Sequence, residues 1–244
     1  MKIIAANWKM NKTREDAHRF FGELAEKMKL QHRGQISNDK NVIICVPFTA
    51  IVIAREYADE LGFTVGAQNF HPAKNGAYTG EISAEMLCEI GTRAVLVGHS
   101  ERRTLFGETD DFVAQKVTGA LTNGLTPILC VGEKDGEKLE AVLSKQLKSY
   151  QKGAIIAYEP VWAIGTGKVA TIAQIEQAHA LIKKLVAESN AGGLNPPEPP
   201  AVLYGGSVNE KNAAEILAAK NVDGVLVGGA SLDADKFMTI ITCV

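Results

Sequence analysis

The sequence has few of the features that mark a secreted, membrane-bound or metal-dependent protein. Its 244 residues include only four cysteines, Cys45, Cys88, Cys130 and Cys243, with no Cys-x-x-Cys pair and no histidine at zinc-ligand spacing. This pattern argues against a disulfide framework or a metal site and is typical of reduced thiols in a reducing compartment. The apolar run from Ile3 to Ala6 is too short for a signal-peptide core, and no membrane-spanning run follows. We therefore expect a cytoplasmic protein without a membrane partner.

The sequence also lacks an excess of charge of either sign. Lys and Arg together number 26 and Asp and Glu 28, so the formal net charge is -2. This balance gives no reason to expect nucleic acid or an anionic membrane surface as a partner. Any phosphate that the protein binds should be small and bound locally. No low-complexity tract or block of like charge divides the chain, so we expect residues 1–244 to form a single domain.

Eight short apolar runs rich in Val, Ile, Leu and Ala recur along the chain. They are Ile3 to Ala6, Val42 to Val46, Thr64 to Ala67, Ala94 to Val97, Pro127 to Val131, Ala154 to Tyr158, Ala201 to Tyr204 and Gly224 to Val227. The runs show no polar alternation, which is typical of strands buried on both faces. Segments with helical spacing lie between them, for example residues 17–28 behind Thr13 and residues 175–185 behind Thr171. Because parallel strands need crossover helices, eight such units predict an α/β protein folded as a single (β/α)8 barrel of parallel strands.

Polar side chains follow several of these runs directly, and active sites of α/β barrels lie at the carboxyl ends of the strands. Asn7 and Lys9 follow the first run, His99 and Glu101 the fourth, and Glu159 the sixth. In a closed barrel these groups converge on one mouth. A carboxylate, an imidazole and an ammonium group that face one small pocket form a proton-transfer constellation.

Each of these residues also has a simpler interpretation. Glu159 could be a strand-end carboxylate paired with a lysine, His99 a structural histidine, and Lys9 a surface lysine. Cys130 could be mistaken for a nucleophile. We interpret it as a buried packing thiol near Glu159, because no histidine lies nearby in the sequence and the chemistry needs no covalent step.

Two glycine turns and one loop complete the candidate site. Gly205-Gly206-Ser207 and Gly228-Gly229 follow the last two runs and precede helical patterns, so backbone N–H groups and helix dipoles can surround a phosphate dianion. Tight strand-to-helix turns would also explain these glycines. The segment from Pro160 to Lys168 follows Glu159 directly. Its apolar middle predicts a lid that covers a ligand and excludes water, although a packed structural loop is the alternative.

Together, these segments resemble the triosephosphate isomerase family over essentially the whole chain. The resemblance is carried by Ala6-Asn7-Trp8-Lys9-Met10-Asn11, Gly76 to Glu81, Gly98 to Arg103, Cys130 to Glu133, Tyr158 to Gly167, Tyr204 to Val208 and Leu226 to Leu232. Two departures are Tyr78, where Phe is frequent in the family, and Val169, where the lid often ends in Thr or Ser. No residue expected for the chemistry is missing.

The resemblance implies a TIM barrel that needs no cofactor or metal. It implies interconversion of dihydroxyacetone phosphate and D-glyceraldehyde 3-phosphate by proton transfer through an enediolate, in glycolysis and gluconeogenesis. In the family pattern Glu159 is the base and His99 is the electrophile, whose imidazole stays neutral because the following helix lowers its pKa. Asn7 and Lys9 contact the substrate oxygens, with Glu101 beside them.

The resemblance also implies how the phosphate, the lid and a second subunit are arranged. Residues of the phosphate and lid region that it assigns to substrate binding are Gly165, Ser207, Gly228 and Gly229. The Tyr204 hydroxyl should meet the backbone near Ala170, and the Ser207 hydroxyl the backbone near Gly167, so that both latch the closed lid. The loop from Gln68 to Glu81 should form a homodimer, with Thr79 reaching the active site of the neighbouring subunit.

Two other functions remain open from the residues alone. One is a lyase or aldolase that acts on a phosphorylated triose and uses Lys9 as a Schiff-base amine. The other is a barrel that binds a phosphate ester without turnover. Glu159 argues against the binding protein, because a carboxylate beside an anionic ligand weakens binding unless it takes part in chemistry.

Overall fold

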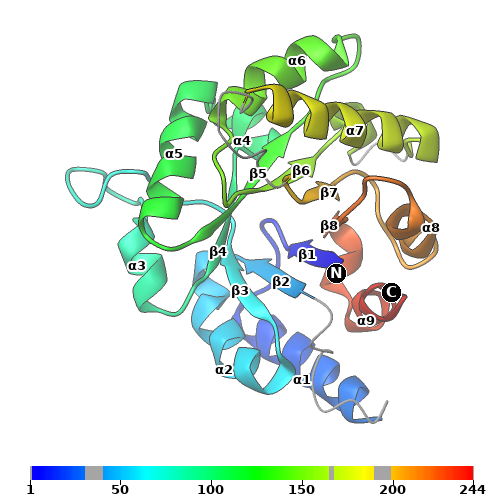
Figure 1. Cartoon of the computed structure of the whole chain (residues 1–244). Helices are drawn as coiled ribbons and strands as arrows, with labels where there is room; N and C mark the ends of the chain where they lie inside the picture. The colour runs from blue at the N-terminus through cyan, green and yellow to red at the C-terminus, as the bar shows by residue number, and fades with distance from the viewer. Residues whose placement is uncertain (1, 31–40, 165–167, 190–198, 244) are drawn as a thin grey trace.

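A computed structural model describes residues 2–30, 41–164, 168–189 and 199–243 of the chain. Within these ranges, eight parallel strands pair in chain order and close into a barrel, which confirms the predicted fold class (Figure 1). The strands are β1 (Ile3–Asn7), β2 (Asn41–Val46), β3 (Thr64–Ala67), β4 (Ala94–Val97), β5 (Thr126–Val131), β6 (Ile155–Tyr158), β7 (Val202–Tyr204) and β8 (Gly224–Val227). Each strand agrees with its predicted apolar run to within one residue at either end.

Both faces of the strands are buried, which explains why the sequence shows no polar alternation. Along β1, Ile3 and Ala5 belong to a cluster that fills the barrel interior, whereas Ile4 and Ala6 belong to the layer between the strands and the helices. The other strands, except β3, also contribute alternate residues to these two clusters; β3 contributes only to the outer one. A parallel sheet covered by helices requires this two-sided burial.

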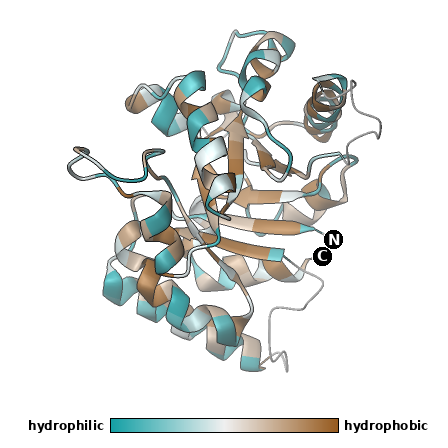
Figure 2. Cartoon of the chain, turned by 60° about the vertical axis from the view of Figure 1, so that its left-hand side comes forward, coloured by the Kyte–Doolittle hydropathy of each residue, from teal (hydrophilic) through white to brown (hydrophobic). Residues whose placement is uncertain are grey.

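Helices cover the outside of the barrel (Figure 1). The α-helices are α1 (Arg14–Leu30), α2 (Ile51–Leu61), α3 (Ala84–Glu89), α4 (Ser100–Leu105), α5 (Asp110–Thr122), α6 (Leu139–Gln146), α7 (Ile172–Ser189), α8 (Ala213–Ala218) and α9 (Ala234–Thr242). Short 3-10 turns add η1 (Phe48–Ala50), η2 (Leu147–Ser149), η3 (Val161–Ala163) and η4 (Gly229–Leu232). In α1, Ala17, Phe20, Phe21, Leu24 and Met28 are buried, as their spacing predicted. Figure 2 shows the strands as the most hydrophobic layer and polar residues on the outer helix faces.

The connection between β3 and α3 is one of the long βα loops of the barrel. Residues 68–83 join β3 to α3 and project away from the body of the molecule (Figures 1 and 2). Residues 74–81 of this loop are exposed, including Tyr78, which has 49% of its surface accessible. A polar and aromatic loop of this length is typical of a binding element.

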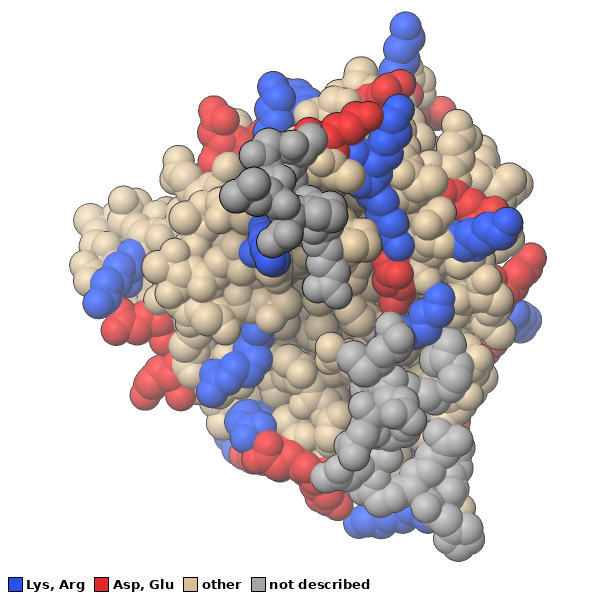
Figure 3. Space-filling view, viewed as in Figure 1, with Lys and Arg blue, Asp and Glu red and all other residues tan. Residues whose placement is uncertain are grey.

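The surface has mixed charge, in keeping with the balanced composition. Basic and acidic side chains are interspersed over the face shown in Figure 3. In the described part of the chain, no helix is both long and apolar enough to span a bilayer.

Candidate active site

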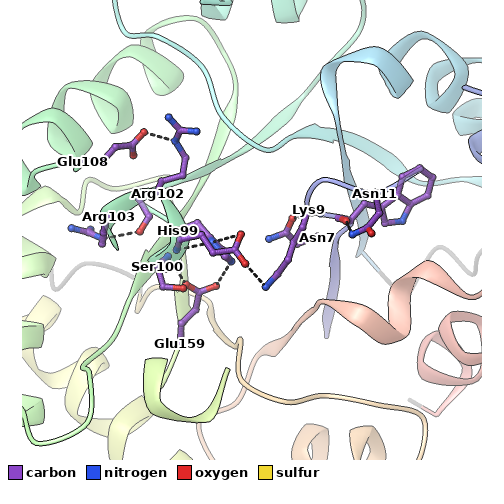
Figure 4. Close-up of polar contacts among 12 residues, drawn as sticks. Asn7, Lys9, Asn11, His99, Ser100, Arg102, Arg103, Glu108 and Glu159 are labelled. Carbon is purple, nitrogen blue, oxygen red and sulfur yellow. Dashed lines mark hydrogen bonds and ion pairs between the residues drawn. The ribbon is translucent and has the colours of Figure 1, made fainter. Parts of the chain in front are cut away.

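The carboxyl ends of β1, β4 and β6 bring the predicted catalytic residues together. Lys9, His99 and Glu159 all line one cavity of about 480 Å3, and Asn7 lies beside them. The turns after β7 and β8 also line this cavity. Figure 4 shows the Lys9 and Glu159 side chains approaching the His99 region from different strands. The arrangement places a carboxylate, an imidazole and an ammonium group around one space, as proton transfer requires.

The segment after β1 holds Lys9 in an unusual backbone conformation. Lys9 has a φ of 53°, which costs a residue with a side chain roughly 1–3 kcal/mol. The Asn7 Oδ1 atom accepts the Lys9 backbone N–H at 3.0 Å, and Asn11 donates to the Trp8 carbonyl at 2.7 Å. The Trp8 ring is fully buried, and its Nε1 donates to the Ser231 carbonyl at 3.2 Å. These contacts fix the direction in which the Lys9 side chain leaves the strand.

Lys9 reaches an acidic partner from the next part of the site. Its Nζ lies 2.7 Å from Oε1 of Glu101, and both side chains are partly exposed. The Lys9 side chain also passes the turn after β8, because a Cβ built on Gly228 would lie 3.8 Å from its Cε. Lys9 therefore stands between the groups after β4 and the glycines after β8.

His99 is the N-cap of α4, the helix predicted to follow it. Its Nδ1 accepts the backbone N–H of Glu101 at 3.2 Å, which requires a neutral ring that carries its proton on Nε2. The proton therefore lies on Nε2, which is 3.1 Å from Oε1 of Glu159. The helix cap selects the tautomer that presents an N–H to the cavity.

Glu159 is almost fully buried, with 2% of its surface accessible. Besides His99, it contacts the backbone N–H of Ser100, which donates to Oε2 at 3.1 Å (Figure 4). Burial raises the pKa of Glu159, but His99, the Ser100 N–H and Lys9 favour the carboxylate, and the pKa lies below its ordinary value. Glu159 is consequently ionised in the free protein and ready to accept a proton.

The pKa of His99 differs in direction from the expectation. Burial, the largest single effect, lowers this pKa, but the carboxylates of Glu159 and Glu101 together raise it, and the pKa lies above its ordinary value. Helix α4 follows His99 as expected, and the pKa rises because of the neighbouring carboxylates. A carboxylate 3.1 Å from Nε2 stabilises the imidazolium, and the backbone N–H at Nδ1 opposes it.

Small residues leave room for Glu159. A Cβ on Gly132 would lie 1.8 Å from the Glu159 carbonyl oxygen, and one on Gly205 would lie 3.0 Å from its Cγ. Cys130 is buried next to the base, and burial followed by the Glu159 charge raises the pKa of its thiol well above the ordinary value. Cys130 is therefore a protonated packing residue, as the sequence predicted.

The glycine turns after β7 and β8 lie where the sequence placed them. Gly205, Gly206 and Ser207, together with Gly228 and Gly229, line the cavity. The turn after β8 enters η4 directly at Gly229. The helical pattern expected after Ser207 is α8, which begins at Ala213, so the N–H groups near Ser207 belong to a loop and not to a helix end.

The expected lid latch differs in the contacts that the structure describes. The Ser207 hydroxyl donates to the Ala163 carbonyl at 2.8 Å, at the start of the segment after Glu159. The Tyr204 hydroxyl is buried beside the backbone of Ala170, as expected, but makes no hydrogen bond of ordinary geometry among the described residues; burial raises its pKa to about 12, and the Ala170 backbone opposes this rise. Gly165 and Gly167, which were expected to bind substrate and to meet Ser207, lie outside the described residues.

Sequence reasoning missed an acidic residue below the lid segment. Glu133 is buried and accepts hydrogen bonds from the Tyr158 hydroxyl at 3.1 Å and from Trp162 Nε1 at 2.7 Å. Its carbonyl also accepts the Val161 N–H. Glu133 follows β5 at the carboxyl end of the strand, so the filter that selected Glu159 could have selected it too.

No set of three or more His, Cys, Asp and Glu side chains in the described ranges is arranged to hold a metal ion.

Comparison with known proteins identifies similar sequences. The family described as "Triosephosphate isomerase" matches residues 2–244. The "Triosephosphate isomerase" of Halorhodospira halophila is 45% identical over 251 residues, which cover 98% of this chain and 96% of that protein. The proteins of the same name from Nitratidesulfovibrio vulgaris and Lawsonia intracellularis are each 46% identical over 254 residues, covering 98% and 99% of this chain and 98% of each relative.

Proposed function

The chain belongs to the triosephosphate isomerase family, and from this membership we propose a role for each group in the cavity. The enzyme interconverts dihydroxyacetone phosphate and D-glyceraldehyde 3-phosphate in glycolysis. The observation that supports the assignment of roles is that Glu159, His99 and Lys9 line one cavity whose lining also includes the two glycine turns. A triose phosphate has an anionic end for the glycines and two reacting carbons for the carboxylate.

In this proposal Glu159 takes the proton from one substrate carbon and returns it to the neighbouring carbon. Its lowered pKa keeps it ionised before substrate binds. In the free protein the carboxylate is held by His99 and Ser100. Substrate must replace His99 at Oε1, so the contact seen here holds the base in its charged form until it is used, while Ser100 can stay at Oε2.

His99 donates the Nε2 proton to a substrate oxygen. Once Glu159 has taken up the substrate proton it is neutral, and it no longer raises the pKa of His99. The backbone N–H of Glu101 at Nδ1 then favours the neutral imidazole. A neutral ring can pass a proton between the two substrate oxygens without forming a costly ion pair.

Lys9 and Asn7 stabilise the negative charge that develops on the enediolate oxygens. The strained backbone and the fixed neighbours of Lys9 preorganise the ammonium group, and one well-placed donor of this kind contributes about 3 to 4 kcal/mol. Glu101 pairs with Lys9 in the free protein and keeps it oriented. Ser207, Gly228 and Gly229 bind the phosphate, together with Gly165.

The lid and its latch are also part of the proposal. An enediolate beside a phosphate ester can eliminate phosphate to give methylglyoxal, so closure must hold the intermediate. The buried hydroxyl of Tyr204, which has no hydrogen-bond partner of ordinary geometry among the described residues, supports a role as a latch that gains its partner when the segment from Pro160 to Lys168 closes. Closure of this segment would also have to break the hydrogen bond that the Ser207 hydroxyl donates to the Ala163 carbonyl.

We further propose that the whole chain acts as one barrel domain in the cytoplasm and forms a homodimer. The exposed loop of residues 74–81 supports the dimer, because it projects from the barrel without a covering element of its own chain (Figure 1). Thr79 lies on this exposed part. In the dimer it would lie near Asn7 and Lys9 of the other subunit.

A coupled assay tests the function directly. Purified protein is given D-glyceraldehyde 3-phosphate, and formation of dihydroxyacetone phosphate is followed through an NADH-linked dehydrogenase. Borohydride added with substrate tests the alternative, because only a Schiff base on Lys9 is reduced to a stable adduct. We expect rapid isomerisation and no borohydride inactivation. Covalent trapping at Lys9, or binding without turnover, would contradict the assigned roles.

A further inference from the structure

A second cavity lies on the β4 and β5 side of Glu159, whereas the active-site cavity lies on the β1, β7 and β8 side. We call it the back pocket. Its volume is about 260 Å3, and its lining includes Ser100, Arg103, Cys130, Gly132, Val142 and Gln146. Of the residues that the structure describes, only Glu159 lines both cavities. The catalytic base is therefore the wall between two separate spaces.

The back pocket has the polarity and the size to hold water. Arg103 crosses its wall, donating through Nε to the Gly98 carbonyl at 2.7 Å and through Nη1 to Asp110 at 2.6 Å. At its outer edge the Lys145 side chain is 75% exposed, so this edge meets the solvent. A cavity of this volume accommodates several water molecules at about 30 Å3 each, with charged and amide groups as partners.

One oxygen of the Glu159 carboxylate belongs to the back-pocket side. Oε2 accepts the backbone N–H of Ser100, and Ser100 lines the back pocket but not the active-site cavity. The Cys130 thiol, also in the back-pocket wall, is close enough to the carboxylate for the charge of Glu159 to raise its pKa. Water can therefore approach the base without entering the space that a substrate occupies.

We propose that the back pocket supplies the water that exchanges the proton carried by Glu159 during turnover. This inference rests on the proposed function, in which Glu159 is a carboxylic acid while the enediolate exists. In D2O, the O–H bond of that acid breaks, an O–D bond forms, and the original proton leaves as HOD. Nothing is oxidised or reduced. Bound substrate occupies the active-site cavity on the other side of Glu159, so exchange through the back pocket does not require release of the intermediate.

The experiment measures how often the substrate hydrogen returns to the product. Isomerisation of unlabelled D-glyceraldehyde 3-phosphate is run in D2O, and NMR separates dihydroxyacetone phosphate that carries the transferred hydrogen from that carrying deuterium. Val142 is half-buried on α6 and lines the back pocket, so the series Val142→Leu, Val142→Phe and Val142→Trp fills it in steps. Ala141→Phe adds bulk at an exposed position of the same helix that does not line the pocket.

We expect the hydrogen-to-deuterium ratio in the product to rise at least twofold along the Val142 series, with kcat/KM within twofold of the parent. Ala141→Phe should leave the ratio unchanged. An unchanged ratio in the Phe variant, or an equal rise in the Ala141 control, would overturn the back-pocket route. If the Trp variant does not fold, the Leu and Phe variants give the same comparison. Failure of the proposed function is distinct, because the parent enzyme would then form no dihydroxyacetone phosphate.

Discussion

The substitution Tyr204→Phe tests whether Tyr204 is a latch for the lid or only a packing residue. In the described structure the Tyr204 hydroxyl is fully buried and has no hydrogen-bond partner among the described residues. An unpaired buried hydroxyl costs roughly 1–3 kcal/mol relative to a paired one. Its removal should therefore leave the free energy of unfolding of the free enzyme unchanged or increase it. The measurement is urea unfolding of Tyr204→Phe and the parent protein in the absence of ligand.

The same substitution should weaken the closed state. One hydrogen bond formed only on closure contributes roughly 0.5–1.5 kcal/mol, which corresponds to a roughly two- to tenfold loss of affinity for an inhibitor that resembles the enediolate. Affinity for inorganic phosphate should change less, because phosphate alone contacts the glycine turns in either state. The variant should isomerise more slowly and release more methylglyoxal per turnover.

Tyr158 provides the matched control. Its hydroxyl donates to Glu133 and is paired before any ligand binds, so Tyr158→Phe should lower the free energy of unfolding by about 1 kcal/mol or more. The latch reasoning is refuted if Tyr204→Phe destabilises the free enzyme as much as Tyr158→Phe does and binds the inhibitor as tightly as the parent. Tyr204 would then be an ordinary buried strand-end residue.

Three further predictions concern the base, a buried histidine and the dimer. Glu159→Asp should lower kcat about 100-fold or more, because one methylene misplaces the base, while phosphate affinity stays nearly constant; near-parental turnover in the coupled assay would remove Glu159 from the base role. Burial lowers the pKa of His179 to about 4. The contribution of the neutral ring to the free energy of unfolding is therefore complete above pH 6.5. As the pH falls from 6.5 through 4, up to about 3 kcal/mol of that free energy is lost. His179→Asn should therefore show a smaller loss of melting temperature between pH 7.5 and 5 than the parent, and equal losses would contradict this. Thr79→Arg should convert the dimer to monomers of much lower activity by light scattering and assay; a fully active monomer would exclude the proposed role of the loop.

The strands and the convergence of the catalytic groups could be predicted from the sequence because both follow from burial. A strand buried on two faces must be apolar throughout, so β1 and β8 stand out as short apolar runs. The first polar side chain after such a run must lie at the mouth of the barrel. Asn7 and Glu159 were predicted in this way, with Lys9 two residues after Asn7, without knowledge of any contact between them.

Other features depend on choices that a linear pattern does not encode. The direction of the pKa shift of His99 follows from the position of the Glu159 carboxylate, and that position is set by the Ser100 N–H in three dimensions. The Ser207 hydroxyl donates a hydrogen bond to the Ala163 carbonyl, which is 44 residues away in the chain. The back pocket is formed by residues from several elements, and no spacing in the sequence reveals a space between side chains.

At Lys9, the residue that best suits the left-handed backbone is not the residue that catalysis needs. Glycine would adopt a φ of 53° without a steric penalty, so the chain would fold more readily without the side chain that stabilises the intermediate. Selection for stability alone would therefore remove Lys9, and only selection for turnover keeps it. Stability screens of variant libraries should enrich glycine here and report the inactive enzyme as an improvement.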